Sequence, residues 1–558
     1  MGRPALPRRR FLVAAFAALV LAGPVVAADS PVATVTQTLS GLDDVASGGF
    51  EPPDVQVAAG PGYVVEMVNL AERVWRTSSG AAATHVQTQD LGAFFGSGVD
   101  RLTDPRIIYD ALSGRWFASI SNVDARSILV AVSAGGDPTA SWAITSYPAP
   151  GCADQPRLGL ADGTVVLAAD IFVSCVEGGS RPIGAELWVV NKQQLLAGSK
   201  QPDFTTYGPD PKFSSFAPVQ SLSATSTEYV VSVDAPTSRV VHLLAVDGIP
   251  PAAVSIKEIA TPSITRMSRP PFATQPPTAS GRAQQQIDTN DDRVLESVWE
   301  KDRLWLSGNT GCLPAGDSLI RSCARIVELS TTTRTVTTES DLSQPGAHVF
   351  YPAIRPDGSG NLVVVYGESG LTVLPEVVAI GRTTDGTFTN PVVVAQSISA
   401  YVGDRYGDYF GAARDPANPG LVWVAGEAGT DVAGGRGWAT TVASVAITVP
   451  GAAPPPVLGG TPPAVRAVHA KGRVGKVVRL AFRSLDDASG VRTVVTVRSK
   501  GAVVFKLTTA KASLHAGQLY FVVWRPVKKL HGTLPYCVHS VSASGAPSPQ
   551  SCSTVTLR

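Results

Sequence analysis

Short apolar runs alternate with turn residues along almost the whole chain. The runs Tyr63–Val68, Arg115–Ile120 and Thr164–Ala169 are typical, since each is strongly apolar and directly follows a glycine. No segment keeps apolar residues at i, i+3, i+4 and i+7 for three turns, so the pattern does not predict long helices. Short, evenly spaced strands separated by turn residues are typical of all-β proteins. We therefore expect an all-β fold.

A unit of about 50 residues recurs within this pattern. Each copy has a polar or proline-containing start, a short strand, a turn and a more apolar strand, and a more polar strand pair follows. Seven copies begin at or near Asp54, Asp104, Asp154, Phe216, Asp291, Tyr351 and Asp408. Four strands in a copy of this length are typical of a β-propeller blade. The sequence therefore predicts a seven-bladed β-propeller over residues 29–450, with a six-bladed ring as the alternative.

A proline-rich segment, residues 451–463, separates the repeats from a shorter tail. Its composition is typical of a semi-rigid linker of polyproline type. The tail, residues 464–558, contains further alternating strands, among them Val491–Val497 and Leu519–Trp524. Its length and the spacing of its turns predict a single small β-sandwich.

Residues 1–28 have the organisation of a secretory signal peptide. Three arginines at positions 8–10 precede an apolar run at 11–26, and the alanines at 27 and 28 suit a signal peptidase. The pair Arg8-Arg9 before Phe11 also resembles the twin-arginine export signal, and the general secretory route is the alternative. No later run reaches the roughly 20 apolar residues that span a bilayer. We expect a secreted, extracellular protein without a transmembrane segment.

Six cysteines lie in three local pairs, Cys152 with Cys175, Cys312 with Cys323, and Cys537 with Cys552. Counting alone leaves 15 possible pairings. Proximity, an even number and an export signal favour three disulfides in an oxidising compartment. Zinc binding is disfavoured, because no two cysteines have C-x-x-C spacing and no histidine pair flanks them.

The net charge of +1 hides a strong asymmetry along the chain. The tail from residue 464 carries 15 Lys and Arg against two acidic residues, a net charge of +13, whereas residues 29–463 carry −16. Such asymmetry is informative about partners rather than about fold. We expect the tail to associate with an anionic cell-wall polymer or an acidic lipid surface, and the alternative is a module whose high isoelectric point is incidental. Its strands offer no aromatic stacking platform, so nucleic acid is not expected as a partner.

The polar residues that begin the repeats are the candidate ligand-binding site. If each repeat starts with the innermost strand of a blade, these residues surround one mouth of a central channel: Asp54, Asp104, Arg106, Asp154, Arg157, Asp291, Arg293 and Asp408. Carboxylates and guanidiniums that converge in a concavity suit sugar hydroxyls or a charged ligand. The alternative is structural, in which these side chains pair with one another and cap strand ends.

Other chemistry has weaker support. Asp288, Asn290 and Asp292 present the alternating oxygens of a calcium loop, but the Gly and the later Glu of an EF-hand are missing, so a solvated acidic turn is favoured. No other cofactor is expected. Glycoside hydrolysis needs two carboxylates at a defined separation. The candidates are Glu66, Glu296, Glu368 and Glu427, which we expect near the ends of second strands, where they can face the channel. Esterase, metalloprotease and phosphate-loop motifs are absent from the sequence.

Three segments resemble bacterial secreted proteins related to the sialidase and BNR-repeat propellers: Glu51–Ala58, Asp104–Phe117 and Gly407–Gly411. The resemblance spans roughly residues 49–447, and the tail resembles immunoglobulin-like or fibronectin-type modules. It implies a propeller fold, whereas Arg106-Ile107-Ile108 lacks the proline of the sialidase Arg-Ile-Pro motif and the Asp boxes are incomplete. No catalytic residue is therefore carried over. We expect a non-catalytic propeller that binds an extracellular glycan or protein, and the alternative is a divergent sialidase-like glycoside hydrolase.

Overall fold

The computed structural model describes residues 30–78, 81–175, 180–277, 286–403, 405–429, 437–450, 465–485, 488–500, 502–509, 512–514, 518–527, 529–541, 548 and 550–558, together with Gly2. These residues form 38 strands and two helices of five residues each, α1 (Leu91–Phe95) and α2 (Lys192–Leu196). The predicted all-β fold is confirmed. The predicted signal peptide (apart from Gly2) and the linker at 451–463 lie outside the described residues.

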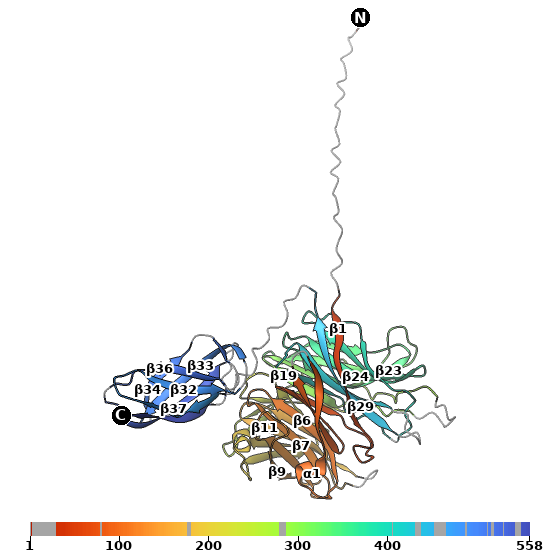
Figure 1. Cartoon of the computed structure of the whole chain (residues 1–558). Helices are drawn as coiled ribbons and strands as arrows, with labels where there is room; N and C mark the ends of the chain where they lie inside the picture. The colour runs from red at the N-terminus through yellow and green to blue at the C-terminus, as the bar shows by residue number, and fades with distance from the viewer. Residues whose placement is uncertain are drawn as a thin grey trace.

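Most strands belong to antiparallel groups of four that follow one another along the chain (Figure 1). The first group is β2 (Gln56–Gly60), β3 (Tyr63–Val68), β4 (Ala71–Ser78) and β5 (Ala81–Asp90). The second is β6 (Leu102–Asp110), β7 (Arg115–Asn122), β8 (Ser127–Ser133) and β9 (Trp142–Pro148). The third is β10 (Cys152–Leu160), β11 (Thr164–Phe172), β12 (Pro182–Asn191) and β13 (Phe204–Asp210). The fourth is β14 (Ala217–Pro218), β16 (Glu228–Val233), β17 (Val241–Asp247) and β18 (Ser255–Ala260).

Three more groups complete this part of the chain. The fifth is β19 (Val294–Glu300), β20 (Arg303–Cys312), β21 (Arg321–Ser330) and β22 (Thr335–Leu342). The sixth is β23 (Ala347–Pro356), β24 (Leu362–Gly370), β25 (Val373–Arg382) and β26 (Val392–Gln396). The last is β27 (Gly411–Arg414), β28 (Leu421–Gly429), β29 (Trp438–Thr448) and β1 (Val32–Asp43). The short β15 (Gln220–Ser221) pairs in parallel with β10 and β19 and joins the third and fifth groups into one sheet of nine strands.

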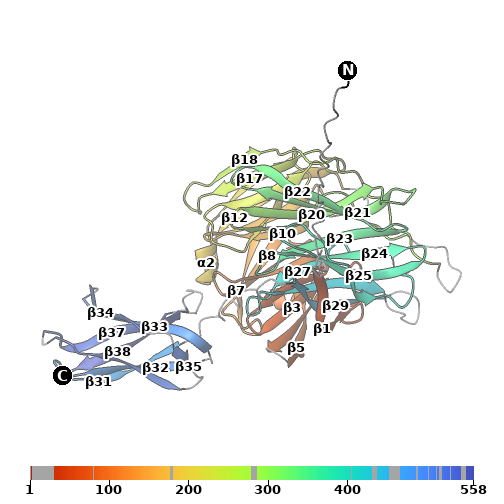
Figure 2. The same cartoon turned by 90° about the horizontal axis from the view of Figure 1, so that it is seen from above.

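The first strands of the groups contact one another in a closed order. Strand β2 contacts β6, and the contacts continue through β10, β14, β19, β23 and β27 back to β2. Each sheet remains open, so the ring is closed by packing between sheets and not by one continuous set of hydrogen bonds. Figures 1 and 2 show these sheets packed against one another. This circular arrangement of four-stranded sheets is a β-propeller.

The second strand of each group is buried on both faces, which explains its continuous apolar sequence. In β11, Val165 and Leu167 pack toward the second group, whereas Val166 packs toward the fourth. In β20, Leu304 and Trp305 divide in the same way between two hydrophobic clusters. Successive side chains point to opposite faces of a strand, so one strand supplies two cores. The outer strands, such as β13, alternate between exposed and partly buried residues.

The C-terminal residues form two further sheets. One contains β30 (Val465–Val468), β32 (Val478–Ser484) and β36 (Leu519–Trp524). The other contains β31 (Ala470–Gly472), β38 (Ser551–Leu557), β37 (Gly532–Val541), β33 (Ala488–Ser499) and β34 (Ala502–Thr508), and β35 (Ala512–Leu514) pairs with β33. Leu480 and Trp524 of the first sheet and Val495 and Tyr536 of the second belong to one hydrophobic core. The two sheets are therefore one folding unit with a shared interior.

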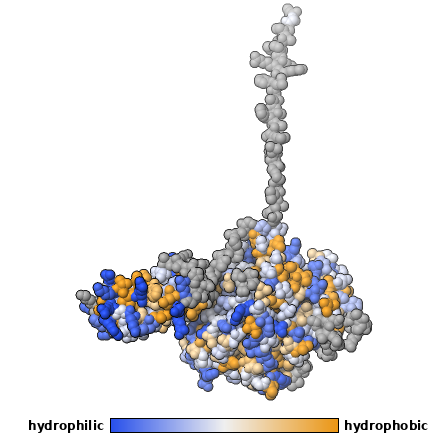
Figure 3. Space-filling model, in the orientation of Figure 1, coloured by the Kyte–Doolittle hydropathy of each residue, from blue (hydrophilic) through white to orange (hydrophobic). Residues whose placement is uncertain are grey.

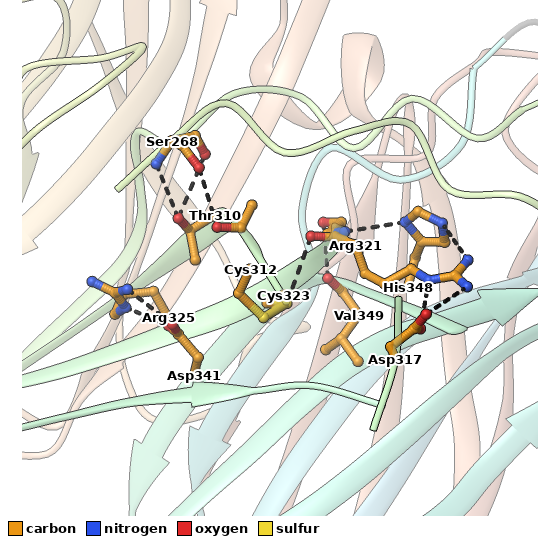
Figure 4. The surroundings of a disulfide bond; sticks show 12 residues. Ser268, Thr310, Cys312, Asp317, Arg321, Cys323, Arg325, Asp341, His348 and Val349 are labelled. Atoms are coloured by element: carbon orange, nitrogen blue, oxygen red, sulfur yellow. Dashed lines mark hydrogen bonds and ion pairs between the residues drawn. A yellow bond between two sulfur atoms is a disulfide. The ribbon is translucent and has the colours of Figure 1, made fainter. Parts of the chain in front are cut away.

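All three predicted disulfides are present: Cys152–Cys175, Cys312–Cys323 and Cys537–Cys552. The second connects β20 to β21, and the third connects the paired strands β37 and β38. Figure 4 shows the Cys312–Cys323 bond with Arg321 close by, between Asp317 and His348. The Arg321 side chain donates to Asp317 at 2.9 Å, and burial lowers the pKa of His348 to about 4, with the Arg321 charge as a second cause.

No helix in the described part of the chain is long and apolar enough to cross a membrane.

Candidate functional site

The first strands surround a cavity on the axis of the propeller. Its lining takes at least one residue from every group: Gln56, Arg106, Arg157, Pro218, Glu296, Arg355 and Ala412. The cavity contains about 970 Å³, counting the part that is open to solvent. A concavity with convergent polar groups is the default location of a ligand site.

An unusual backbone conformation marks one end of this channel. Asp54, Asp104 and Asp408 have positive φ angles of 51°, 56° and 73° at the start of β2, in β6 and before β27. Gln155, Asn290 and Tyr351 have the same conformation at the corresponding points of three other groups, and the fourth group has no such residue. Asp and Asn tolerate this left-handed region better than most residues. The residues equivalent to Asp54 and Asp104 are thus Gln155 and Asn290 in the third and fifth repeats, one position away from the predicted Asp154 and Asp291.

Asn69 holds two of these aspartates in place. Its Nδ2 donates to Asp54 Oδ2 at 2.6 Å, and its Oδ1 accepts from the backbone N–H of Asp104 at 2.9 Å. One buried amide therefore links the starts of the first and second groups. Asn309 has the same role further round the ring, since its Oδ1 accepts from the N–H of Tyr351 at 2.8 Å. The sequence pattern did not predict a role for either asparagine, although each lies at a similar place in its repeat.

Four carboxyl groups converge at this end of the channel. Burial raises the pKa of Asp104 to about 7, with the charge of Asp154 as the second cause. Burial and the charge of Asp170 raise the pKa of Asp154 to about 6. Burial also raises the pKa of Asp54 and Asp408, and each of these two interacts electrostatically with neighbouring carboxylates. Near neutral pH Asp104 is therefore partly protonated, and a protonated carboxyl group donates a hydrogen bond as well as accepting one.

Arg293 connects this cluster to a neighbouring pair. Its guanidinium donates to both oxygens of Asp291 at 2.8 Å and to Asp170 Oδ2 at 2.7 Å. It also donates to Gln155 of the third repeat. The predicted residues Asp291 and Arg293 thus bond to each other, as the structural alternative expected, and they also tie the fifth repeat to the third.

A layer of arginines lies along the channel below the carboxyl groups. Arg106 Nε donates to Pro156 O at 2.9 Å, and its guanidinium lies 3.9 Å from the centre of the Tyr409 ring. Arg157 Nη1 donates to Leu295 O at 2.9 Å. Arg355 Nε donates to Ala412 O at 2.9 Å. Each arginine therefore spans the gap between two first strands.

The four glutamates proposed from the sequence lie in different surroundings. Glu296 lines the channel, but it belongs to the first strand β19 and not to a second strand. Glu66, on β3, accepts from the N–H of Leu42 at 3.0 Å, and Glu427, on β28, accepts from the N–H of Gly407 at 2.6 Å. Glu368 lies on β24 and does not line the cavity. Glu66, Glu368 and Glu427 are thus not part of the cavity lining, although Glu427 lies near enough to the carboxyl end for the charge of Asp408 to act on it.

Two residues of the suggested calcium loop, Asp288 and Asn290, accept hydrogen bonds from backbone N–H groups within the loop. Asp288 Oδ1 accepts from the N–H of Asn290 at 2.8 Å, and Asn290 Oδ1 accepts from the N–H of Asp291 at 2.9 Å. Burial raises the pKa of Asp292 to about 6. Within the described ranges, no group of three or more His, Cys, Asp or Glu side chains is arranged to hold a metal ion. The bonds of Asp288 and Asn290 are those of turns, whereas Asp292 is buried and both its carboxyl oxygens have no hydrogen-bond partner among the described residues.

No protein-family model and no curated protein matches this sequence. Among solved structures, the chain is similar to a fungal alcohol oxidase of the AA5 family in complex with copper, with 13% identity over 94% of this chain and 100% of the other and a TM-score of 0.34. It is also similar to a protein of unknown function from Dyadobacter fermentans (12% identity, 75% and 99% covered, TM-score 0.36) and to Trypanosoma rangeli sialidase (10% identity, 86% and 86% covered, TM-score 0.29). At TM-scores below 0.5, these likenesses carry no information about activity.

Proposed function

We propose that this chain is a secreted, seven-bladed β-propeller that binds a polar extracellular ligand, a glycan or a protein, at the channel end where the aspartates converge. The observation that carries the proposal is that Asp54, Asp104, Asp154 and Asp408 come from four different groups and lie close enough to act on one another electrostatically. Partly protonated carboxyl groups donate and accept hydrogen bonds, which suits sugar hydroxyls and peptide groups. The seven four-stranded groups support the number of blades.

Glycan and peptide arrays probed with the mature protein test this proposal. We expect binding that Asp104→Asn weakens by about tenfold or more, since hydrogen bonds to charged groups contribute ~1.5–3 kcal/mol. The matched control is Asp124→Asn, whose carboxylate is paired with Arg101 on the outer surface. Equal loss in both variants, or no change in either, would refute a ligand site at the aspartates.

A divergent glycoside hydrolase is the second candidate, and one observation favours it. The pKa of Asp104 is raised to about 7 beside carboxyl groups that share its surroundings, and hydrolases need one carboxyl that remains protonated beside one that is ionised. A panel of chromogenic glycosides separates the candidates. Turnover that Asp104→Asn abolishes and Asp124→Asn leaves unchanged would replace the binding proposal with the hydrolase.

The C-terminal unit, as we propose, is an immunoglobulin-like sandwich that associates with an anionic cell-wall polymer. The described residues from 465 onward include no Asp or Glu, and Figure 3 shows strongly hydrophilic side chains on the visible face of this unit. Exposed charges are screened over about 8 Å at physiological salt and about 3 Å at 1 M. We expect retention on isolated cell walls at 0.15 M salt and release at 0.5 M. Retention that salt does not change would contradict an electrostatic contact.

Secretion is part of the proposal, and three disulfides support it because they persist in oxidising compartments. Substituting Arg8 and Arg9 by lysine separates the two export routes. Loss of export indicates the twin-arginine route, because that signal is read by a receptor. Unchanged export indicates the general secretory route.

A further inference from the structure

We propose that the middle of the channel binds a small oxyanion between Arg106 and Arg157. This position lies among the first strands, below the carboxyl groups that the proposed function uses. The inference stands on the arginines alone, so it holds whether or not a ligand binds at the aspartates.

The first observation is a set of buried donors without acceptors. Arg106 and Arg157 are each only 5% exposed, and both line the channel. Nε and Nη2 of Arg157 and Nη2 of Arg106 have no hydrogen-bond partner among the described residues. Buried polar groups in proteins are hydrogen-bonded with few exceptions. Three such donors on two residues that line one cavity therefore point to an acceptor beside them.

The second observation is an excess of positive charge at this level of the channel. Arg106, Arg157 and Arg355 all act electrostatically on the one carboxylate among them, Glu296. The Glu296 carboxylate lies 3.4 Å from Arg355, and the further channel arginine Arg414 is paired with Glu300 at 3.0 Å. Glu296 is the one acidic residue of the cavity lining, which also contains four arginines. Arginine does not lose its proton in proteins, so the lining carries an excess of positive charge that favours an anion in the cavity.

The carboxyl groups at the end of the channel do not remove this excess. Asp54 and Asp104 lie within electrostatic range of Arg106, yet neither is hydrogen-bonded to it in the described structure. Burial raises the pKa of Asp104 to about 7 and also raises the pKa of Asp54. Asp170 and Asp291 act electrostatically on Arg157, but both are hydrogen-bonded to Arg293. Water in the channel would satisfy the N–H groups but would leave the charge unbalanced.

The arrangement of the open donors defines the class of anion. Nε and Nη2 lie on one side of the planar guanidinium and point in parallel, so they suit two oxygens of the same group. A carboxylate, phosphate or sulfate has such a pair of oxygens, and a halide does not. Nη2 of Arg106 supplies a third donor from the neighbouring strand. The oxyanion is either a free ion or the acidic group of a larger ligand that enters the channel.

Calorimetric titration of the mature protein with sodium sulfate, phosphate and acetate tests the inference, with sodium chloride at equal ionic strength as the reference. We expect saturable binding of an oxyanion at one site and none of chloride. Arg157→Gln should weaken this binding by about tenfold or more, because it removes two charge-assisted hydrogen bonds. The exposed Arg101→Gln should leave the affinity unchanged.

Glu296→Gln keeps the proposal testable if Arg157→Gln does not fold. It removes the nearest negative charge at constant size, so oxyanion binding should become tighter by about threefold or more. Glucuronic acid, with glucose as its neutral control, separates the two sources: affinity equal to that of acetate indicates a free ion, and higher affinity indicates an acidic ligand. No saturable binding of any oxyanion, or equal affinity in wild type and both channel variants, would overturn the inference. The titration contains no array ligand, so its failure leaves the proposed function untouched.

Discussion

Asn69 offers the sharpest test of how the carboxyl end of the channel is built. The substitution Asn69→Ala removes a buried amide that joins two groups of the propeller. It removes two donated bonds, to Asp54 Oδ2 at 2.6 Å and to Pro52 O at 3.2 Å, and one accepted bond, from the Asp104 N–H at 2.9 Å. The other oxygen of Asp54 already has no partner, so this carboxyl group loses its only hydrogen bond in the described structure.

The cost follows from these lost contacts. A buried polar group left without a partner costs ~1–3 kcal/mol, more when it is charged. Two such groups, the Asp54 carboxyl and the Asp104 N–H, therefore predict a loss of ~3–5 kcal/mol in the free energy of unfolding. Both aspartates have positive φ angles. This left-handed backbone conformation costs ~1–3 kcal/mol for each residue. Without Asn69 we expect this end of the channel to relax, and ligand binding at Asp104 to be lost with it.

Urea unfolding followed by tryptophan fluorescence measures the stability, and the arrays measure the binding. Asn309→Ala is the matched comparison, because its amide makes two backbone hydrogen bonds and none to a carboxylate. It should cost less, ~2–3 kcal/mol, and should leave Asp54 in place. The reasoning is refuted if Asn69→Ala destabilises by less than ~1 kcal/mol, or if the two variants lose the same amount and bind ligand equally.

Three further predictions concern the frame of the propeller. Cys312→Ser opens a disulfide with a sequence separation of 11 and should lower the free energy of unfolding by ~3 kcal/mol. Its denaturation midpoint should lie between that of the oxidised wild type and that of the reduced wild type, which lacks all three disulfides; a midpoint equal to that of the oxidised wild type would contradict the prediction. Burial raises the pKa of Glu66 from 4.5 to about 7, so the folded state holds a proton that the unfolded chain releases, and stability should fall as pH rises from 4.5 to 7. Glu66→Gln should reduce this fall in the free energy of unfolding by up to ~3 kcal/mol. If the stability of the variant differs between pH 5 and pH 8 by as much as that of the wild type, Glu66 is not the cause. Lys192→Met breaks a buried pair with Asp110 at 2.8 Å and should cost ~3–5 kcal/mol, whereas the more exposed Lys212→Met should cost below ~1 kcal/mol; similar midpoints for the two would count against the burial argument.

The repeats could be read from the sequence because their strongest signal is local. Each second strand is buried on both faces, so its apolar run stands out between two turns, as at Leu362–Tyr366 within β24. Strand β1 was not assigned, because its alternating residues predict a strand but contain no information about its partner β29 at the far end of the repeats. Pairing between distant strands depends on which edge remains free after the local hairpins have formed.

The residue types of the candidate site could be predicted from the sequence, whereas their hydrogen-bond partners and strand positions could be predicted only in part. The predicted aspartates Asp54, Asp104, Asp154 and Asp408 lie near one another, and Arg106 and Arg157 line the cavity, because the ring brings equivalent positions to one axis. The roles of Asn69 and Asn309 were not predicted, since a single asparagine near a strand end has no distinctive pattern. Glu296 was assigned to the wrong kind of strand, because Val294–Glu300 is as apolar as a second strand.

The pairing of β1 with β29 has a consequence for how the chain folds. Thr36 and Ser444 are 408 positions apart, and their hydroxyl oxygens lie 2.7 Å from each other. Contacts this distant along the chain slow folding, although the entropy of closing a long loop grows only slowly with its length. Until β1 docks, the outer edge of β29 remains an open template for another strand. A second molecule can supply an identical β1, so refolding at high protein concentration is expected to yield domain-swapped dimers that dilution before refolding prevents.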